Sequence, residues 1–147
     1  MEGRAAAVKL LLEKGSDLRA RNKYGGTALS FGLLNDKAET VGTLLEHGAD
    51  IKKDSSFAFG WRDTAMARVL LGHGVSVNEK SLTGWTPLMY AVGGGHRDVV
   101  VFLIEHGADV NVVTDRGVTA LSIASEPGPF GRDGKMIKIL KKAGAKE

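Results

Sequence analysis

The chain has 147 residues, a length typical of one domain, with 43% hydrophobic and 25% charged residues, as in ordinary globular proteins. Its 20 Lys and Arg against 17 Asp and Glu give a net charge of +3, too mild for a dedicated nucleic-acid-binding or membrane-surface protein. Glycine is the unusual residue type, because 20 glycines are nearly twice the average share of about 7%.

The glycines recur with a period. Five apolar segments end in a glycine, and these glycines are spaced by 33, 26, 33 and 37 residues. A second motif, Gly-x-Thr-(Ala/Pro)-Leu, begins at Gly25, Gly84 and Gly117 and keeps the same phase. Two motifs in one register indicate repeated structural units. The glycines that end the five segments are Gly15, Gly48, Gly74, Gly107 and Gly144.

The chain opens on half a unit. A helix is predicted from Ala5 to Glu13 with no partner helix before it, so residues 1–21 correspond to the second half of a repeat. We expect the chain to begin within a repeat, as a C-terminal piece of a larger protein. Residues 22–54 then form a full unit.

Residues 55–80 form a unit that is seven residues short. Ser55 to Gly60 is a candidate first helix, and Asp63 is expected to open a second helix that runs through Leu71. The deletion then falls in the connector between Ile51 and Ser55. The alternative is a loop missing from the sequence. Phe59 and Trp61 are expected to fill the core at this irregular joint.

Residues 81–113 show the unit most clearly. Thr86-Pro87-Leu88 predicts a helix start, since proline is tolerated in a first turn, and three glycines after Val92 predict its end. A second helix is expected from Arg97, with apolar residues at helical spacing, until Gly107 ends it. Neither helix can bury its apolar face alone, so we expect neighbouring units to stack.

Residues 114–147 form the last unit, with a four-residue insertion at Glu126–Gly131. Phe130 within it is expected to fold back onto the repeat or to present an exposed contact. Four lysines make one side of the final helix polar, which is typical of a terminal repeat that keeps the end of an array soluble. They are Lys135, Lys138, Lys141 and Lys142.

In period and motif, residues 81–113 resemble an ankyrin repeat. Residues 22–54 match nearly as well, residues 114–147 match with the insertion, and residues 1–21 and 55–80 match in part. The resemblance implies an all-α solenoid of stacked helix–turn–helix units joined by short hairpin-like connectors. It covers essentially the whole chain, which we expect to form a single domain of residues 1–147.

The sequence departs from the family pattern at two positions of the repeat. The family usually starts its connector with Asp, and the polar residues found here can still accept a local hydrogen bond, so the turns are expected to survive. They are Asn22, Ser81 and Thr114.

The family usually has His after the Thr-Pro-Leu triplet, where this chain has Ser30, Met89 and Ser122. Met89 cannot replace that hydrogen bond, which is expected to cost its repeat roughly 1 kcal/mol.

No residue pattern predicts catalysis, a cofactor or a metal. His47, His73 and His106 precede repeat glycines, which predicts helix C-terminal roles, and His96 lies at an inter-helix turn. The carboxylates recur with the repeat, as structural residues do, rather than forming one unique acid/base pair. Gly93-Gly94-Gly95-His96 lacks the Gly-Lys-Ser/Thr ending of a phosphate-binding loop. We therefore expect a protein that is not an enzyme.

The resemblance implies contact with a protein partner through the connector tips and a concave helix surface. Trp85 is the sharpest candidate, as an aromatic side chain that either anchors a partner or packs on the connector of a neighbouring repeat. The residues at these positions are Lys23, Tyr24, Leu34, Asn35, Leu82, Thr83, Trp85, Asp115, Arg116 and Val118.

The expected function is therefore protein–protein recognition without chemistry. The alternative is a regulatory or substrate-positioning module cut from a larger enzyme. Nucleic-acid binding through the basic last helix is disfavoured, since such a face is usually only solvated. We expect no small-molecule substrate and no membrane. A chain without cysteine, without a signal peptide and without an 18-residue apolar run fits an intracellular, cytoplasmic protein.

Overall fold

The computed structural model describes residues 3–35, 37–51, 61–127 and 133–146. These residues form eight α-helices and no β-strand, as the repeat pattern predicts. The helices are α1 (Gly3–Glu13), α2 (Ala28–Leu34), α3 (Ala38–Glu46), α4 (Thr64–Gly72), α5 (Pro87–Gly93), α6 (Arg97–Glu105), α7 (Ala120–Ser125) and α8 (Gly134–Lys142).

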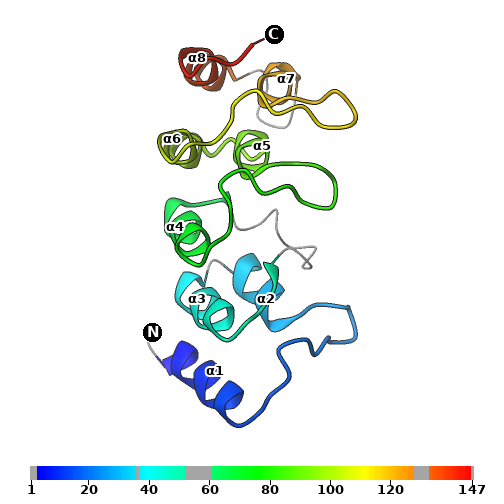
Figure 1. The fold of residues 1–147 in the computed structure, drawn as a ribbon, viewed down its shortest axis with the longest axis vertical. Coiled ribbons are helices and arrows are strands. Elements are labelled where there is room, and N and C mark those ends of the chain that lie inside the picture. Colours follow the sequence, from blue (N-terminus) through cyan, green and yellow to red (C-terminus); the bar gives the residue numbers. More distant parts are fainter. Residues whose placement is uncertain (1–2, 36, 52–60, 128–132, 147) are drawn as a thin grey trace.

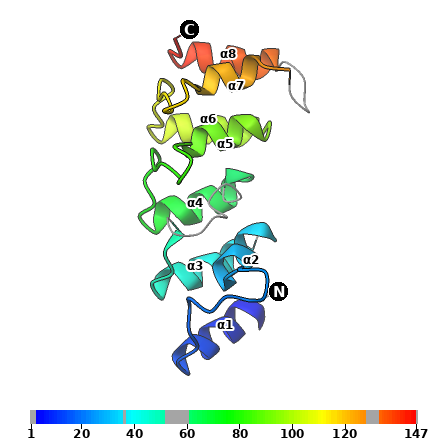
Figure 2. The same ribbon diagram turned by 90° about the vertical axis from the view of Figure 1, so that its right-hand side faces the viewer.

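The helices stack in two columns. In Figure 1, α2, α5 and α7 form one column, and α3, α4, α6 and α8 form the other, with α1 at the N-terminal end. Helices contact one another within pairs (α2 and α3, α5 and α6, α7 and α8) and along the columns (α5 and α7, α3 and α4, α4 and α6). Figure 2 shows the same helices edge-on as successive layers. This is the solenoid that the repeats predict.

The first helices begin at the threonines of the repeated motif, as predicted for Thr86. Thr27, Thr86 and Thr119 each accept a backbone N–H in the first turn, and Pro87 occupies the first turn of α5. In α2 and α7 the threonine N–H in turn donates to a serine hydroxyl oxygen, to Ser30 at 2.8 Å and to Ser122 at 2.9 Å.

Helix α5 carries only half of this capping arrangement. Thr86 Oγ1 accepts the Met89 N–H at 3.4 Å, but Met89 has no hydroxyl to accept the Thr86 N–H in return. Its side chain is instead buried, with 1% exposed, and so contributes apolar packing.

The second helices end as the repeat glycines predict. Gly107 has φ of +88°, a left-handed conformation that glycine adopts without strain, and its N–H bonds to the Ile104 carbonyl at 3.0 Å. The preceding histidines reach back to their own helices. The distance from Nδ1 to the carbonyl oxygen four residues earlier is 2.8 Å for His47, 2.7 Å for His73 and 2.7 Å for His106. The helix C-terminal role predicted for these three histidines is confirmed.

The apolar core is continuous along the stack. Val99, Val100 and Leu103 on α6 are fully buried, as the helical spacing predicts. Trp61 is fully buried as well, which confirms its assignment to the core of the short repeat, and Asp63 caps α4 by accepting the Met66 N–H at 2.8 Å. The helix predicted for Ser55–Gly60, and Phe59 within it, lie outside the described residues.

Two asparagines, each in the segment that follows a second helix, join successive repeats. Asn78 donates to the Gly107 carbonyl at 3.2 Å and accepts the Asp109 N–H at 2.8 Å. Asn111 donates to the Gly144 carbonyl at 3.1 Å and accepts the Lys146 N–H at 2.9 Å. Each side chain therefore satisfies a donor and an acceptor of the next repeat, which fixes the spacing between the two repeats.

Helix α8 forms the terminal layer. Its four lysines, at positions 135, 138, 141 and 142, are exposed, whereas Met136 and Leu140 are buried. The polar, solvent-exposed face predicted for the last helix is therefore confirmed. Asp133 caps the helix and bonds to Arg97 of α6, with Arg97 Nη2 and Nε at 2.9 and 3.1 Å from Asp133 Oδ2. Phe130 in the insertion lies outside the described residues.

The N-terminal layer is thinner. Leu10 and Leu11 on α1 are 54% and 58% exposed, while Val8 and Leu12 pack against the core. The predicted second helix is confirmed, and it starts at Gly3 rather than at Ala5. Among the described residues, no helix has the length and apolar character needed to cross a bilayer.

Truncation of a buried residue tests the stacking. Leu103→Ala removes a fully buried side chain between repeats, and we expect the free energy of unfolding to fall by about 2–5 kcal/mol. Val101→Ala on the exposed side of the same helix is the control. Urea unfolding measures both, and a loss below about 0.5 kcal/mol for Leu103→Ala would show that the helix phase is wrong.

Acid should weaken the link between α6 and α8. The Met136 backbone N–H and then the Arg97 guanidinium hold the pKa of the Asp133 carboxyl below its ordinary value of 3.8. The carboxylate therefore stabilises the fold above pH 3.8, and this contribution is lost as the pH falls through the lowered pKa.

Asp133→Asn keeps an N-cap residue but removes the charge. We expect the variant to unfold at a lower urea concentration than the parent at pH 7, and the difference to vanish in strong acid. Asp115→Asn on a connector tip is the control. A difference between parent and Asp133→Asn that is independent of pH would refute the assignment.

Candidate protein-interaction surface

The connectors before α2, α5 and α7 are closed locally. A backbone bond spans each turn, from Asn22 N–H to the Gly26 carbonyl (3.0 Å), and likewise from Ser81 to Trp85 (2.9 Å) and from Thr114 to Val118 (3.0 Å). The side chain at the first position also accepts a backbone N–H in every case, at 2.9 Å for Asn22, 3.3 Å for Ser81 and 3.0 Å for Thr114. The predicted survival of these turns is confirmed.

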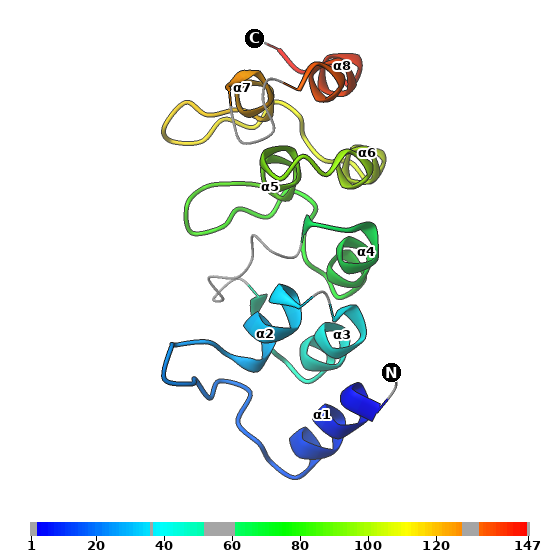
Figure 3. The same cartoon turned by 180° about the vertical axis from the view of Figure 1, so that it is seen from behind.

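All three connectors project from the same side of the stack. Figures 1 and 3 show these loops beyond the column of α2, α5 and α7, on the side opposite to the second helices. We call the connector tips together with the exposed sides of these three helices the connector face. The local bonds hold the backbone of each tip, so the side chains at the tips are displayed from a fixed frame.

The predicted partner-binding residues lie on this face with different exposure. Tyr24 and Leu82 are the most exposed large apolar residues among those that the structure describes, at 81% and 85%. Leu34 is 44% exposed, and the Asn35 amide at the end of α2 donates to the Phe31 carbonyl at 2.8 Å. Exposed residues also include Lys23, Thr83, Asp115 and Arg116, whereas Val118 is half-buried.

Trp85 lies against its own repeat. It is half-buried, its ring centroid is 5.2 Å from that of Tyr90, and a Cβ built on Gly93 would lie 3.4 Å from the ring. The indole therefore covers helix α5 and leaves part of its surface at the connector face.

Tyr90 adds a polar network that the sequence analysis missed. Its hydroxyl lies 2.9 Å from Ser81 Oγ and 3.1 Å from Thr83 Oγ1, and the two smaller hydroxyls are 2.9 Å apart. The three hydroxyls tie the connector tip to α5. Tyr90 lies seven residues after Thr83 and nine after Ser81, and these spacings give no local sequence signal.

The histidines and carboxylates form no cluster suited to a metal ion within the part of the chain that the structure describes. His73 reaches across a repeat boundary, with Nε2 3.6 Å from Glu46 Oε1, and His96 caps α6 without a side-chain hydrogen bond.

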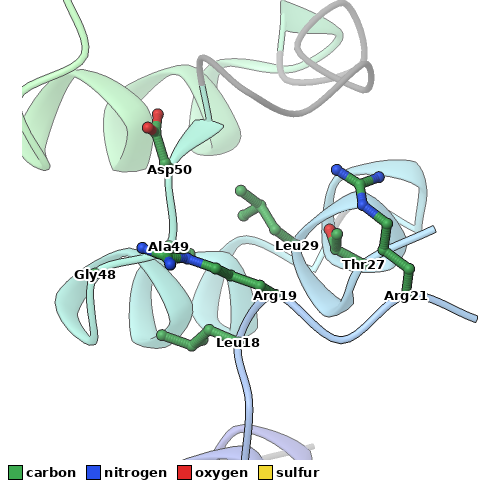
Figure 4. A pocket seen from close by; sticks show the side chains of 8 residues that line it. All are labelled: Leu18, Arg19, Arg21, Thr27, Leu29, Gly48, Ala49 and Asp50. Carbon is green, nitrogen blue, oxygen red and sulfur yellow. The ribbon is translucent and has the colours of Figure 1, made fainter. Parts of the chain in front are cut away.

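A cavity of about 370 Å³ lies between the first two repeats, beside the α1–α2 connector. Leu18 and Leu29 form an apolar floor, and the guanidinium-bearing side chains of Arg19 and Arg21 come from the connector (Figure 4). Asp50 stands on the opposite wall. The sequence analysis did not identify this cavity, because its walls come from two repeats.

Three proteins illustrate what the chain resembles. It is 46% identical over 63 residues to the human NAD-capped RNA hydrolase NUDT12, covering 42% of this chain and 14% of the hydrolase. It is 30% identical over 133 residues to the probable 26S proteasome regulatory subunit p28 of Saccharomyces cerevisiae, covering 83% of this chain and 58% of that protein. It is 27% identical over 110 residues to the putative ankyrin repeat protein FPV034 of fowlpox virus, covering 72% and 26%. The chain thus spans less than two thirds of each relative.

The family model for ankyrin repeats matches residues 57–146 with three copies. The match extends over more than half of the sequence and includes the units with the clearest motifs, and the described helices stack as such repeats require. On this evidence the chain belongs to the ankyrin repeat family.

Proposed function

We propose that the chain is a non-catalytic module that binds a protein partner through its connector face. Ankyrin repeats generally act as protein-interaction modules. One observation carries the proposal for this chain: locally closed connectors hold exposed apolar residues, Tyr24 and Leu82, on the same side of the stack. Exposed aromatic and apolar side chains on a rigid frame are the usual anchors of protein interfaces.

The partner-binding residues belong to this proposal. They include the tips Lys23–Tyr24, Leu82–Thr83 and Asp115–Arg116, together with Leu34, Asn35, Trp85 and Val118. Trp85 is proposed as a central anchor, because its half-buried ring is held by Tyr90 and needs little ordering on binding. The proposed function involves no small-molecule substrate, no nucleic acid and no membrane.

The proposed unit is one domain of residues 1–147. We propose the repeat boundaries at 22–54, 55–80, 81–113 and 114–147, with a half-repeat at 1–21. Its proposed setting is inside the cell, in the cytoplasm, where a cysteine-free stack needs no disulfide.

A second candidate is a regulatory or substrate-positioning module of a larger enzyme. The 46% identity to NUDT12 favours it, because the match covers only 14% of that hydrolase. A reading frame that continues into a catalytic domain would support this candidate, and one without such a domain would remove it.

Partner capture tests the connector face. The intact chain is immobilised and its partners are quantified by mass spectrometry, for the parent and for Trp85→Ala and Leu82→Ser. We expect at least about tenfold weaker binding of the same partners, since truncation of an interface anchor costs about 2 kcal/mol or more. Val101→Ser, an apolar position 39% exposed on α6, is the matched control.

Thermal melting of each variant separates binding from folding. Leu82 is 85% exposed, so Leu82→Ser should melt like the parent. Variants that fold and retain every partner of the parent would refute the role of the connector face.

A further inference from the structure

An apolar groove of about 550 Å³ lies between α1 and α2, at the N-terminal end of the stack. Ala7 and Val8 of α1 form one wall, and Ala28, Phe31 and Gly32 of α2 form the other. Polar residues around the turn between α2 and α3 complete the lining. In Figure 1, α2 is the first helix of its column from this end, and α1 lies below α3 in the other column.

Helix α7 shows what this side of a first helix normally faces. Phe31 and Ile123 occupy the same repeat position, because each lies four residues after the threonine that caps its helix. A Cβ built on Gly93 of α5 would lie 3.7 Å from Cγ2 of Ile123, so this position of α7 packs on the preceding first helix. On α2 the same position lines the groove. The groove is therefore the place where the column would continue by one helix.

The burial of this side differs between the two helices. Ala120, the first residue of α7, is buried where α7 packs against α5. Ala28, the first residue of α2, is exposed, and so is Phe31. A face that is covered on α7 is thus open on α2.

Helix α1 gives the same comparison. Leu11 and Leu103 each lie four residues before a repeat glycine. Leu103 is fully buried on α6, which packs against its first helix α5, whereas Leu11 is exposed. Leu11 lies on the same side of α1 as Ala7 and Val8, since it follows them by four and three residues. The apolar wall of the groove therefore extends over a further turn of α1.

We propose that this groove binds a short apolar helix of a partner protein, placed against α1 as α5 is placed against α6, and against α2 as α5 is placed against α7. An apolar helix in a hydrophobic groove is a common mode of peptide recognition. The proposal goes beyond the function proposed above, because the site is the end of the stack and not the connector face.

Helix α5 defines the chemistry of the ligand, because it fills the corresponding place between α6 and α7. It has seven residues, about two turns. Leu88, Ala91 and Val92 are buried on it at helical spacing, and Gly93 allows the close approach of Ile123. We therefore expect a helix of about two turns with apolar residues at this spacing and a small residue where it meets Phe31.

A second copy of the chain is the competing occupant. The groove lies between two helices, so one helix can enter it alone. Two copies that met end to end would also have to cover the charged side chains of Lys9 and Glu13, which are exposed on α1. The single helix is therefore the better fit, and the experiment measures self-association as well.

The test is a nuclear magnetic resonance titration of the full ¹⁵N-labelled chain with a peptide of residues 86–97, acetylated and amidated, which carries the α5 sequence. We expect shifts of the amides of residues 7–12 and 28–35. The dissociation constant should be on the order of 1 mM, weak because so short a helix is mostly unfolded in water. The same peptide with Leu88→Ser and Val92→Ser should give no such shifts.

Two variants alter the two walls of the groove. Leu11→Ser removes an apolar contact from α1, and Ala28→Glu places a charge that an apolar helix would have to bury. Each should bind the peptide at least about tenfold more weakly, the effect of losing one buried leucine side chain. Both positions are exposed, so both variants should melt like the parent, and either one suffices if the other does not fold. Val101→Ser on α6 is the control and should bind like the parent.

Any of four results would overturn the proposal. These are no shifts up to about 5 mM peptide, equal shifts with the serine-substituted peptide, unchanged affinity of both groove variants, or shifts confined to other helices. Dimerisation of the parent that Leu11→Ser abolishes would assign the groove to a second copy instead. A longer reading frame whose own preceding residues supply the helix would likewise remove the partner as its source.

The outcome is independent of the partner-capture experiment. Trp85→Ala and Leu82→Ser leave the groove unchanged and should bind the peptide like the parent. Loss of capture by these variants without any peptide binding would leave the connector face standing and the groove refuted. Peptide binding with unchanged capture would leave the groove standing without that face.

Discussion

The structure depends on one constraint: a pair of short helices cannot bury its apolar residues without a neighbouring pair. Helix α6 shows this most clearly, because Val99, Val100 and Leu103 are fully buried although the helix has only nine residues. Its neighbours cover these residues, since α6 packs against α5 of its own repeat and α4 of the preceding one, and Arg97 also bonds to the N-cap residue of α8. Each layer is therefore stable through its neighbours, as in other quasi-one-dimensional folds.

This stacking also sets what the connectors can do. The helix starts at Thr27, Thr86 and Thr119 lie at one level of the repeat, so the turns before them leave the stack on one side. Their own backbone and side-chain bonds then hold the tips without help from a partner. A surface prepared in this way loses little conformational entropy on binding, which suits the recognition proposed above.

The sequence predicts well what is determined within a few residues. Thr86 and Pro87 start α5, Gly107 ends the second helix, and Asp63 caps α4, because each uses bonds within one turn. The same local reasoning explains why Met89 leaves a capping arrangement half-formed.

What joins separate repeats could not be read in this way. The ion pair of Arg97 with Asp133 spans 36 positions, and Asn78 and Asn111 reach partners about 30 residues away. The two asparagines are 33 residues apart, but only the structure shows that each of them bonds to the next repeat. The contact of the Trp85 ring with Tyr90 likewise depends on packing and has no local sequence signal.

Native-state hydrogen exchange tests the central claim, that each layer is stabilised by its neighbours, most directly. Helices α5 and α6 have layers on both sides and should exchange most slowly, whereas α1, with Leu10 and Leu11 exposed, should exchange fastest. A gradient of protection from α6 down to α1 is the predicted result. Equal protection of α1 and α6 would contradict the account, because the chain would then unfold as one closed core.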